Sequence, residues 1–334
     1  MKNVFTTLAL TAGLFITTAA NAEVSEIRVP LGAGGFGFLP LHIMKTHNLV
    51  EKHADLQGVK VKVNWSNFGG PSAMIDALVS GSADFISAGP PSFLILWDKT
   101  KGGVDVKGVA AMSSMPMNLN TRAEHLKTVD DLRGNDKVAV TSVKSSIPSI
   151  VMQMYAVKKY GKEQAFRFDP FTVSMTHGDA ASALLSNSAG ISGHFASAPL
   201  DQAERKTPGV RSIMNSDDVM GGSTTFTMIS TTKRFQERNP KVYGAFLSAL
   251  KEAQDMIKND KPGSAQILID SMGGGKWTLN DMVAMLNDPS IKYTTAPENV
   301  MKYANFMHDI GSLKNRPTSV RDLFFPGVDL SSGN

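Results

Sequence analysis

The strongest constraint on the fold is a repeated unit of strand, glycine-rich turn and helix in the first hundred residues. Residues 26–31 alternate like a strand and run into the glycine-rich segment 32–37, after which a helix is expected from Leu39. Further strands are predicted at 59–65 and 83–87, each followed by a turn and a helix start. Repeated units of this size predict an α/β domain with a mostly parallel sheet.

A similar pattern restarts in the middle of the chain. Strands are predicted at 137–141, 171–174 and 189–192, with helices between them and a helix-rich last third. The chain has 334 residues, which at roughly 150 residues per domain suggests about two domains. No low-complexity linker separates the halves, so we expect the chain to cross between two ordered lobes near 113–120 and 222–226.

Residues 1–22 have the features of a secretory signal peptide. Lys2 supplies the positive start, residues 4–16 form the apolar stretch, and Ala20-Asn21-Ala22 is a small-x-small cleavage site. The apolar run is shorter than the roughly 20 residues that span a bilayer, which argues against a membrane anchor. We therefore predict cleavage after Ala22 and export to a bacterial periplasm.

Composition excludes several classes of function. Lys and Arg number 34 against 30 Asp and Glu, and no dense basic run suggests nucleic-acid binding. The absence of cysteine excludes disulfides, thiolate metal sites and cysteine nucleophiles. None of the seven histidines forms a helical pair with a carboxylate that would complete a metal site, so no metal is expected. Asp169, His177 and Asp179 lie close in sequence, but their spacing assigns them no role.

One nucleotide-like motif needs a different explanation. Gly32, Gly34 and Gly37 match G-x-G-x-x-G between a strand and a helix. A dinucleotide site also needs an acidic residue about 20 residues further on, whereas the next strand ends in residues 64–67 without one. An exported protein also has little access to nucleotide cofactors, so none is expected. Glycines at this position instead let the backbone approach a small ligand, with a helix start behind them.

Small and hydroxyl residues occur at four predicted helix starts. These are Gly37-Phe38, Gly69-Gly70-Pro71-Ser72, Gly89-Pro90-Pro91-Ser92 and Ser145-Ser146. Each could simply cap its helix. In open α/β sheets, however, the loops beyond the carboxyl ends of the strands meet over one crevice, so several helix starts can face one ligand. Their N–H groups and hydroxyls suit a carboxylate, a sulfonate or another oxyanion without requiring a lysine.

The order of several segments resembles a known family. The segments are Phe38-Leu-Pro-Leu41, Leu78 to Phe85, Gly89-Pro-Pro-Ser92, Asn239 to Phe246, and Met301 to Met307 with Asp322-Leu-Phe-Phe325. In this order and spacing, over about 300 residues, they resemble the periplasmic solute-binding proteins of ABC importers for nitrate, sulfonates, taurine and thiamine-precursor pyrimidines.

This resemblance implies a two-lobed, type II-like periplasmic binding protein. Each lobe would be a mostly parallel sheet flanked by helices, with the ligand in the cleft between the lobes. Residues 23–115 and 225–334 would form lobe one, and residues 116–224 would form lobe two. The implied partners are a small-molecule ligand and the transmembrane permease subunits of the importer, and the implied state is a monomer.

The resemblance also implies where the ligand is held. The positions that match the family's binding loops and helix starts are Phe36, Gly37, Phe38, Gly70, Pro71, Ser72, Pro90, Pro91, Ser92, Ser145 and Ser146. Three further candidates lie in lobe two or at the second crossing: His194, Phe195 and Thr224. His194 is placed in the cleft because it follows the predicted strand 189–192.

Two departures from the family pattern affect the choice of ligand. Sulfonate binders of the family tend to have a histidine after the lobe-two serines, where this chain has Ile147-Pro148. Many members have Asp-Ala-Trp at a later strand end, where this chain has Ser192-Gly193-His194-Phe195. An alkanesulfonate therefore cannot simply be transferred, and the prediction is a small organic anion with an apolar or aromatic portion.

Three alternatives remain open from the sequence. A neutral or cationic thiamine-precursor-like pyrimidine would use the same aromatic side chains. An exported hydrolase using His194 is a candidate from another class, although no G-x-S-x-G motif is present and the favoured interpretation is a protein without enzymatic activity. A sensor partner that presents ligand to a membrane receptor would have the same sequence features as a transport protein.

Overall fold

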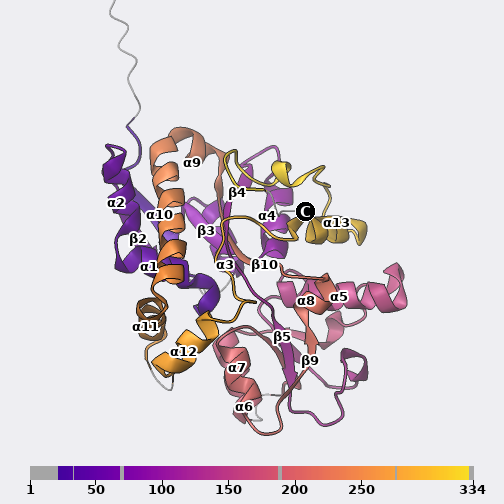
Figure 1. The fold of residues 1–334 in the computed structure, drawn as a ribbon. Helices are drawn as coiled ribbons and strands as arrows, with labels where there is room; N and C mark the ends of the chain where they lie inside the picture. The colour runs from indigo at the N-terminus through magenta and orange to yellow at the C-terminus, as the bar shows by residue number, and fades with distance from the viewer. Residues whose placement is uncertain (1–21, 33, 68–70, 187–189, 275–276, 331–334) are drawn as a thin grey trace, which may run out of the picture.

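Three sheets organise the molecule into two groups of strands. A two-stranded and a three-stranded sheet lie together, and two passages of the chain join them to a five-stranded sheet (Figure 1). The structure is a computed structural model that describes residues 22–32, 34–67, 71–186, 190–274 and 277–330. The predicted signal peptide lies outside the described residues except for Ala22. Within the described residues, no helix combines the length and the apolar character that crossing a membrane requires.

The strands are β1 (Glu26–Pro30), β2 (Lys62–Ser66), β3 (Phe85–Ala88), β4 (Val106–Ser114), β5 (Asn118–Thr121), β6 (Val138–Val140), β7 (Thr172–Ser174), β8 (Gly193–Ala196), β9 (Arg211–Asn215) and β10 (Thr225–Thr232). The α-helices are α1 (Leu39–Thr46), α2 (Leu49–Leu56), α3 (Pro71–Val79), α4 (Pro90–Thr100), α5 (Ile147–Tyr160), α6 (His177–Ser186), α7 (Leu200–Arg205), α8 (Ser216–Met220), α9 (Lys233–Arg238), α10 (Pro240–Asn259), α11 (Lys261–Ser271), α12 (Leu279–Leu286) and α13 (Val300–Asp309). Short 3₁₀ helices are η1 (Phe36–Phe38), η2 (Val129–Asp131), η3 (Lys162–Gln164), η4 (Asp169–Phe171) and η5 (Val320–Asp322).

The sheets are mixed, so the prediction of mostly parallel sheets is wrong. β1 pairs with β2 in parallel, and β6 is parallel to both β7 and β8. In the order β3-β10-β4, however, β10 runs antiparallel to both neighbours. In the order β7-β6-β8-β5-β9, β5 runs antiparallel to β8 and β9.

The antiparallel strands are those next to the passages between the sheets. β4 leaves the three-stranded sheet at Ser114, and β5 enters the five-stranded sheet at Asn118. The returning strand β10 begins opposite the end of β4, with Thr225 paired to Ser114 and Thr232 paired to Val106. A strand that starts where its neighbour ends must run antiparallel to it. Hydrophobic periodicity shows that a strand exists but not in which direction it returns.

The two passages are hydrogen-bonded to each other. The Met117 N–H donates to Ser216 Oγ at 2.9 Å, and the Ser216 N–H donates to the Met117 carbonyl at 2.9 Å. A third segment supports them, because Ser114 and Lys292 exchange backbone hydrogen bonds of 2.9 and 2.8 Å. These bonds satisfy backbone groups that neither sheet ladder can pair.

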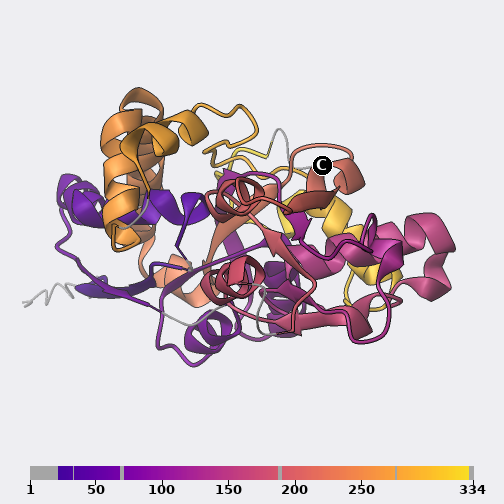
Figure 2. The same ribbon diagram turned by 90° about the horizontal axis from the view of Figure 1, so that it is seen from below.

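Helices cover the sheets with their apolar faces. Figure 2 shows α10, α11 and α12 gathered on one side of the molecule together with α1, and these helices pack on one another. The β3 residue Phe85 stacks on Phe246 of α10, with ring centroids 4.1 Å apart. Both rings are fully buried, so this contact fixes the long helix on the three-stranded sheet.

The first residue after the predicted cleavage site caps α10. Asn239, at the start of this helix, makes no side-chain bond to the first turn. Instead the Glu23 carboxylate accepts hydrogen bonds from the N–H groups of Lys241 at 3.0 Å and Val242 at 2.8 Å. A carboxylate at this position pairs otherwise unsatisfied N–H groups and interacts favourably with the helix dipole.

Glu23→Ala should therefore destabilise the mature protein, by about 0.5–2 kcal/mol, since two N–H groups lose their acceptor. Urea unfolding measures the effect. The matched control is Glu26→Ala, because exposed Glu26 accepts one bond from the side chain of Asn64 on β2 and caps no helix. Equal stabilities of the two variants would contradict the capping role of Glu23.

Candidate ligand-binding site

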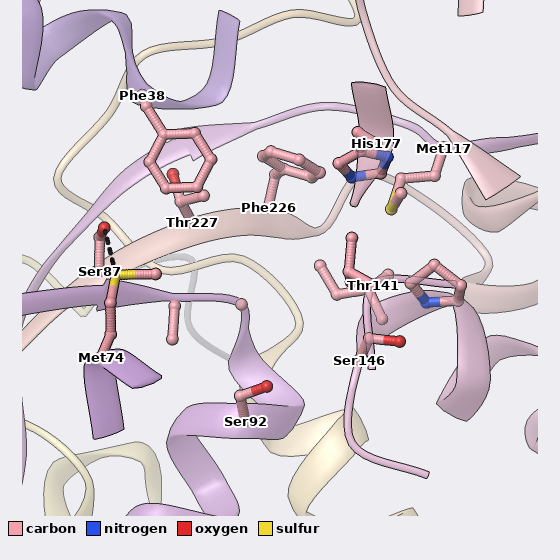
Figure 3. A pocket seen from close by; sticks show the side chains of 14 residues that line it. Phe38, Met74, Ser87, Ser92, Met117, Thr141, Ser146, His177, Phe226 and Thr227 are labelled. Carbon is pink, nitrogen blue, oxygen red and sulfur yellow. Dashed lines mark hydrogen bonds between the residues drawn. The ribbon is translucent and has the colours of Figure 1, made fainter. Parts of the chain in front are cut away.

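A small cavity lies at the meeting point of the two groups of strands (Figure 3). Its volume is about 60 Å³. Its lining from the side of the three-stranded sheet consists of Phe38, Met74, Ser87, Ala88, Gly89, Ser92, Phe226 and Thr227. Its lining from the other side consists of Met117, Thr141, Ser146, Ile147, Pro148 and His177. No Lys, Arg, Asp or Glu is among these described lining residues.

An aromatic pair forms one wall of the cavity. Phe38 and Phe226 lie edge to face, with centroids 6.5 Å apart and an interplanar angle of 73°. Phe38 ends η1, whose Gly37 carbonyl accepts hydrogen bonds from Thr227 Oγ1 at 2.8 Å and Ser113 Oγ at 3.1 Å. These bonds fix η1 on the three-stranded sheet, so the Phe38 ring is held at the cavity.

The glycines of the G-x-G-x-x-G motif serve this close approach. Gly32 has φ 80° and Gly34 has φ 78°, in the left-handed region that favours glycine. Gly37 has no such φ, but a Cβ atom built on it would overlap the Phe226 ring. The motif therefore allows a tight turn and a close backbone contact, and this geometry accounts for it without a nucleotide.

Two helix starts form the opposite side of the cavity. Ser92 is the third residue of α4. It is the first residue of the helix with a backbone N–H, since Pro90 and Pro91 have none. Ser146 is the N-cap of α5. The Ser92 hydroxyl donates to the Ser145 carbonyl at 2.9 Å, and the Ser146 hydroxyl donates to the Ser142 carbonyl at 2.6 Å. The Ser92 bond connects α4 directly to the turn before α5, across the cavity.

His177 closes the cavity on the side of the five-stranded sheet (Figure 3). It is half-buried at the start of α6, and its Nδ1 lies 3.0 Å from His194 Nε2. Burial, followed by the influence of His194, lowers the pKa of His177 to about 3. His177 is therefore neutral at physiological pH and offers one ring N–H.

The structure brings three of the sequence-predicted side chains into the lining: Phe38, Ser92 and Ser146. Gly37 lies directly behind Phe38, and Ser145 contributes the carbonyl that Ser92 binds. Pro90 and Pro91 are buried in the first turn of α4. Pro71 begins α3, whereas Gly70 and the side chains of Pro71 and Ser72 lie outside the described residues.

Four predicted residues are buried outside the lining. Phe36, Phe195 and Thr224 have at most 1% of their surface exposed and belong to the interior. His194 is 1% exposed and lies behind His177. The predicted strand 189–192 is wrong in position, because β8 spans Gly193–Ala196 and places His194 inside the sheet rather than beyond its end.

Sequence reasoning missed several lining residues. His177 follows the strand β7 and begins the helix α6, so it has the position at a helix start that identified the serines. Phe226 and Thr227 gave no such signal, because they lie within β10 rather than at a helix start. Met74 and Met117 are apolar residues of a helix and of a crossing, which in sequence look like core residues.

The chain was compared with known proteins. No family model matches it, and no curated protein sequence matches it. Among solved structures, the alkanesulfonate-binding protein SsuA from Xanthomonas axonopodis pv. citri, bound to MOPS, has a TM-score of 0.68 at 17% identity, covering 88% of this chain and 96% of that one. The periplasmic nitrate-binding protein NrtA from Synechocystis PCC 6803 has a TM-score of 0.67 at 15% identity, covering 88% and 84%.

A third similar structure is the ligand binding component of an ABC-type import system from Staphylococcus aureus, solved with zinc bound. Its TM-score is 0.62 at 16% identity, covering 91% of this chain and 97% of that one. The chain thus has the periplasmic binding protein fold, in the form found in binding proteins for sulfonates and nitrate. Within the described residues of this chain, no group of three His, Asp or Glu side chains is placed to hold a metal ion.

Gly37→Ala should push the Phe226 ring out of its place, because the added methyl group overlaps it. We expect a loss of about 1–3 kcal/mol in the free energy of unfolding, typical of overpacked interiors. Gly103→Ala is the control, since its nearest neighbour is the Thr100 carbonyl at 3.6 Å and its φ is ordinary. A Gly37→Ala protein as stable as the control would show that the close approach is not required.

Ser92→Ala should weaken the connection between α4 and the turn before α5 by about 0.5–1.5 kcal/mol, the contribution of one hydrogen bond. Because the chain contains no cysteine, spin labels can be placed on Lys99→Cys and Lys158→Cys without background labelling. We expect a broader, longer distance distribution in Ser92→Ala. The control is Ser271→Ala, which removes a comparable bond within α11 and should leave the distance distribution unchanged. If the distribution in Ser92→Ala is also unchanged, the Ser92 bond does not connect the two elements.

Proposed function

We propose that this protein captures a small organic anion, a carboxylate or a sulfonate, and delivers it to the permease of an ABC importer. The observation that carries the proposal is the cavity itself. It is lined from both groups of strands, it is small, and it has two helix starts opposite an aromatic wall.

The electrostatics of the cavity support an anionic ligand. α4 and α5 both begin at its edge, and the N-terminal end of a helix favours negative charge. The described lining contains no carboxylate that would repel an anion. Phe38 and Phe226 would contact the apolar part of the molecule, which a bare inorganic ion lacks.

We infer a two-lobed organisation and a periplasmic location. Residues 23–115 and 225–334 would form one lobe and residues 116–224 the other, with closure of the lobes on the ligand read by the permease. This division is supported because β3, β4 and β10 share one sheet, with β1 of the two-stranded sheet beside β3, whereas β5–β9 share another sheet. Cleavage after Ala22 would release a monomeric periplasmic protein whose Glu23 is already held on α10.

A pyrimidine is the second candidate ligand. The Phe38 and Phe226 rings would contact a planar ring as readily as an apolar tail. His177 offers one ring nitrogen for a hydrogen bond. A pyrimidine would use the same cavity without needing the helix dipoles.

Isothermal titration calorimetry against carboxylates, sulfonates and pyrimidines tests the proposal, after native mass spectrometry has identified any molecule that co-purifies. We expect tight binding of at least one organic anion, because the helix starts stabilise its charge. Tight binding of a cation with no anion bound would contradict the electrostatic argument. Recovery of the bound molecule chemically changed after incubation would favour the hydrolase alternative.

A further inference from the structure

Behind His177 lies a buried polar cluster that the ligand cavity does not include. Its members are Asn120 on β5, His194 on β8, and Asp201 and Glu204 on α7. Their exposed fractions are 0%, 1%, 3% and 0%. Charged side chains are rarely buried so fully unless they are paired, so the cluster needs an explanation.

Hydrogen bonds join this cluster to the cavity in a single chain. Glu204 Oε1 lies 2.6 Å from His194 Nδ1, and His194 Nε2 lies 3.0 Å from His177 Nδ1. The Asn120 amide donates to Glu204 Oε2 at 2.9 Å and to Asp201 Oδ1 at 3.1 Å. A continuous path therefore runs from α7 through β8 to the wall of the cavity.

A shared proton between Glu204 and His194 would balance the charges in this cluster. Arg205 binds Asp201 through two hydrogen bonds, of 3.0 and 2.7 Å, and neutralises it. Among the described residues, Glu204 then has no cationic partner other than His194. An unpaired charge in the interior is costly, which favours a pair that is neutral as a whole: either a carboxylate with an imidazolium, or a carboxylic acid with a neutral imidazole. A carboxylate with a neutral imidazole would reverse the direction of the bond between His194 and His177.

Within a neutral pair, the position of the shared proton does not change the direction of the bond to His177. If His194 is cationic, both of its ring nitrogens carry protons, and Nε2–H donates to His177. If Glu204 is the protonated partner, it donates to His194 Nδ1, and the remaining His194 proton is again on Nε2. In both cases His177 Nδ1 accepts. Neutral His177 must then carry its own proton on Nε2, which has no hydrogen-bond partner among the described residues.

We propose that Glu204 and His194 fix His177 as an N–H donor at the wall of the cavity, and that the ligand places a hydrogen-bond acceptor there. The acceptor is an oxygen of a carboxylate or a sulfonate, so His177 selects against ligands that offer only donors at this point. His177 is a ligand-contacting residue, whereas His194 and Glu204 are positioning residues. The assignment of the ligand group rests on the proposed function, but the tautomer of His177 does not.

Nitrogen-15 NMR of the histidine rings in the full mature protein without ligand tests the positioning directly. We expect His177 with a protonated Nε2 and an unprotonated Nδ1. Glu204→Gln should keep this tautomer, because Asn120 holds the new amide oxygen and leaves the amide N–H to donate to His194 Nδ1. Glu204→Leu should abolish the preference. Glu252→Gln is the control, since Glu252 binds Lys52 and His53 away from this cluster, and should preserve it.

Calorimetry with acetate, benzoate and methanesulfonate tests the selection of the ligand. His177→Phe keeps a ring but removes the donor, and should weaken anion binding about 10-fold or more. Unchanged affinity in His177→Phe would overturn this inference, and so would a protonated Nδ1 on His177 in the wild-type protein. Neither result would contradict the proposed capture of an organic anion. Absence of any anion binding by the wild-type protein would instead defeat the proposed function, and the NMR result would still decide the tautomer.

Discussion

The reciprocal hydrogen bonds between Met117 and Ser216 hold together the two passages on which the rest of the structure depends. They keep the end of β4 next to the start of the return segment, and so force β10 to enter its sheet antiparallel to β4. Met117 also lines the cavity. The point where the chain passes between the sheets is therefore also the floor of the candidate binding site, and any relative movement of the sheets changes the shape of that site.

The cavity achieves polarity without placing a charged side chain in its described lining. Helix starts and one neutral histidine provide directed dipoles. These favour an oxyanion and do not require a buried fixed cation to be desolvated when the cavity is empty. The charged groups of the region lie behind His177 and outside the cavity lining, in the cluster of Asn120, His194, Asp201 and Glu204. This separation lets charge influence the orientation of His177 while the ligand itself meets neutral groups.

Periodicity predicted the elements well where only one face of a strand is buried or a turn marks its end. The predicted strand 59–65 overlaps β2, and 137–141 contains β6. Sheet direction could not be predicted, because an apolar strand reads the same in either direction. β8 was misplaced by about four residues, since all four of its residues are buried and alternation gives no register there.

The candidate site was predictable only in part, for a similar reason. Ser92 and Ser146 were found because helix starts have a sequence signature of hydroxyl and proline residues. His194 was chosen over His177 because the predicted strand ended too early. Phe36 and Phe38 differ by two residues, and only the geometry of η1 shows that Phe38 reaches the cavity while Phe36 is fully buried.

A crystal structure of the protein purified from its exported form, without refolding or dialysis against competing anions, tests the central claim most directly. We predict electron density for one small molecule in the cavity between Phe38, Ser92 and His177, in contact with residues from both groups of strands. Density for the ligand in another place, such as the surface groove formed by Lys107, Phe324 and Leu330, with the cavity holding only water, would contradict it.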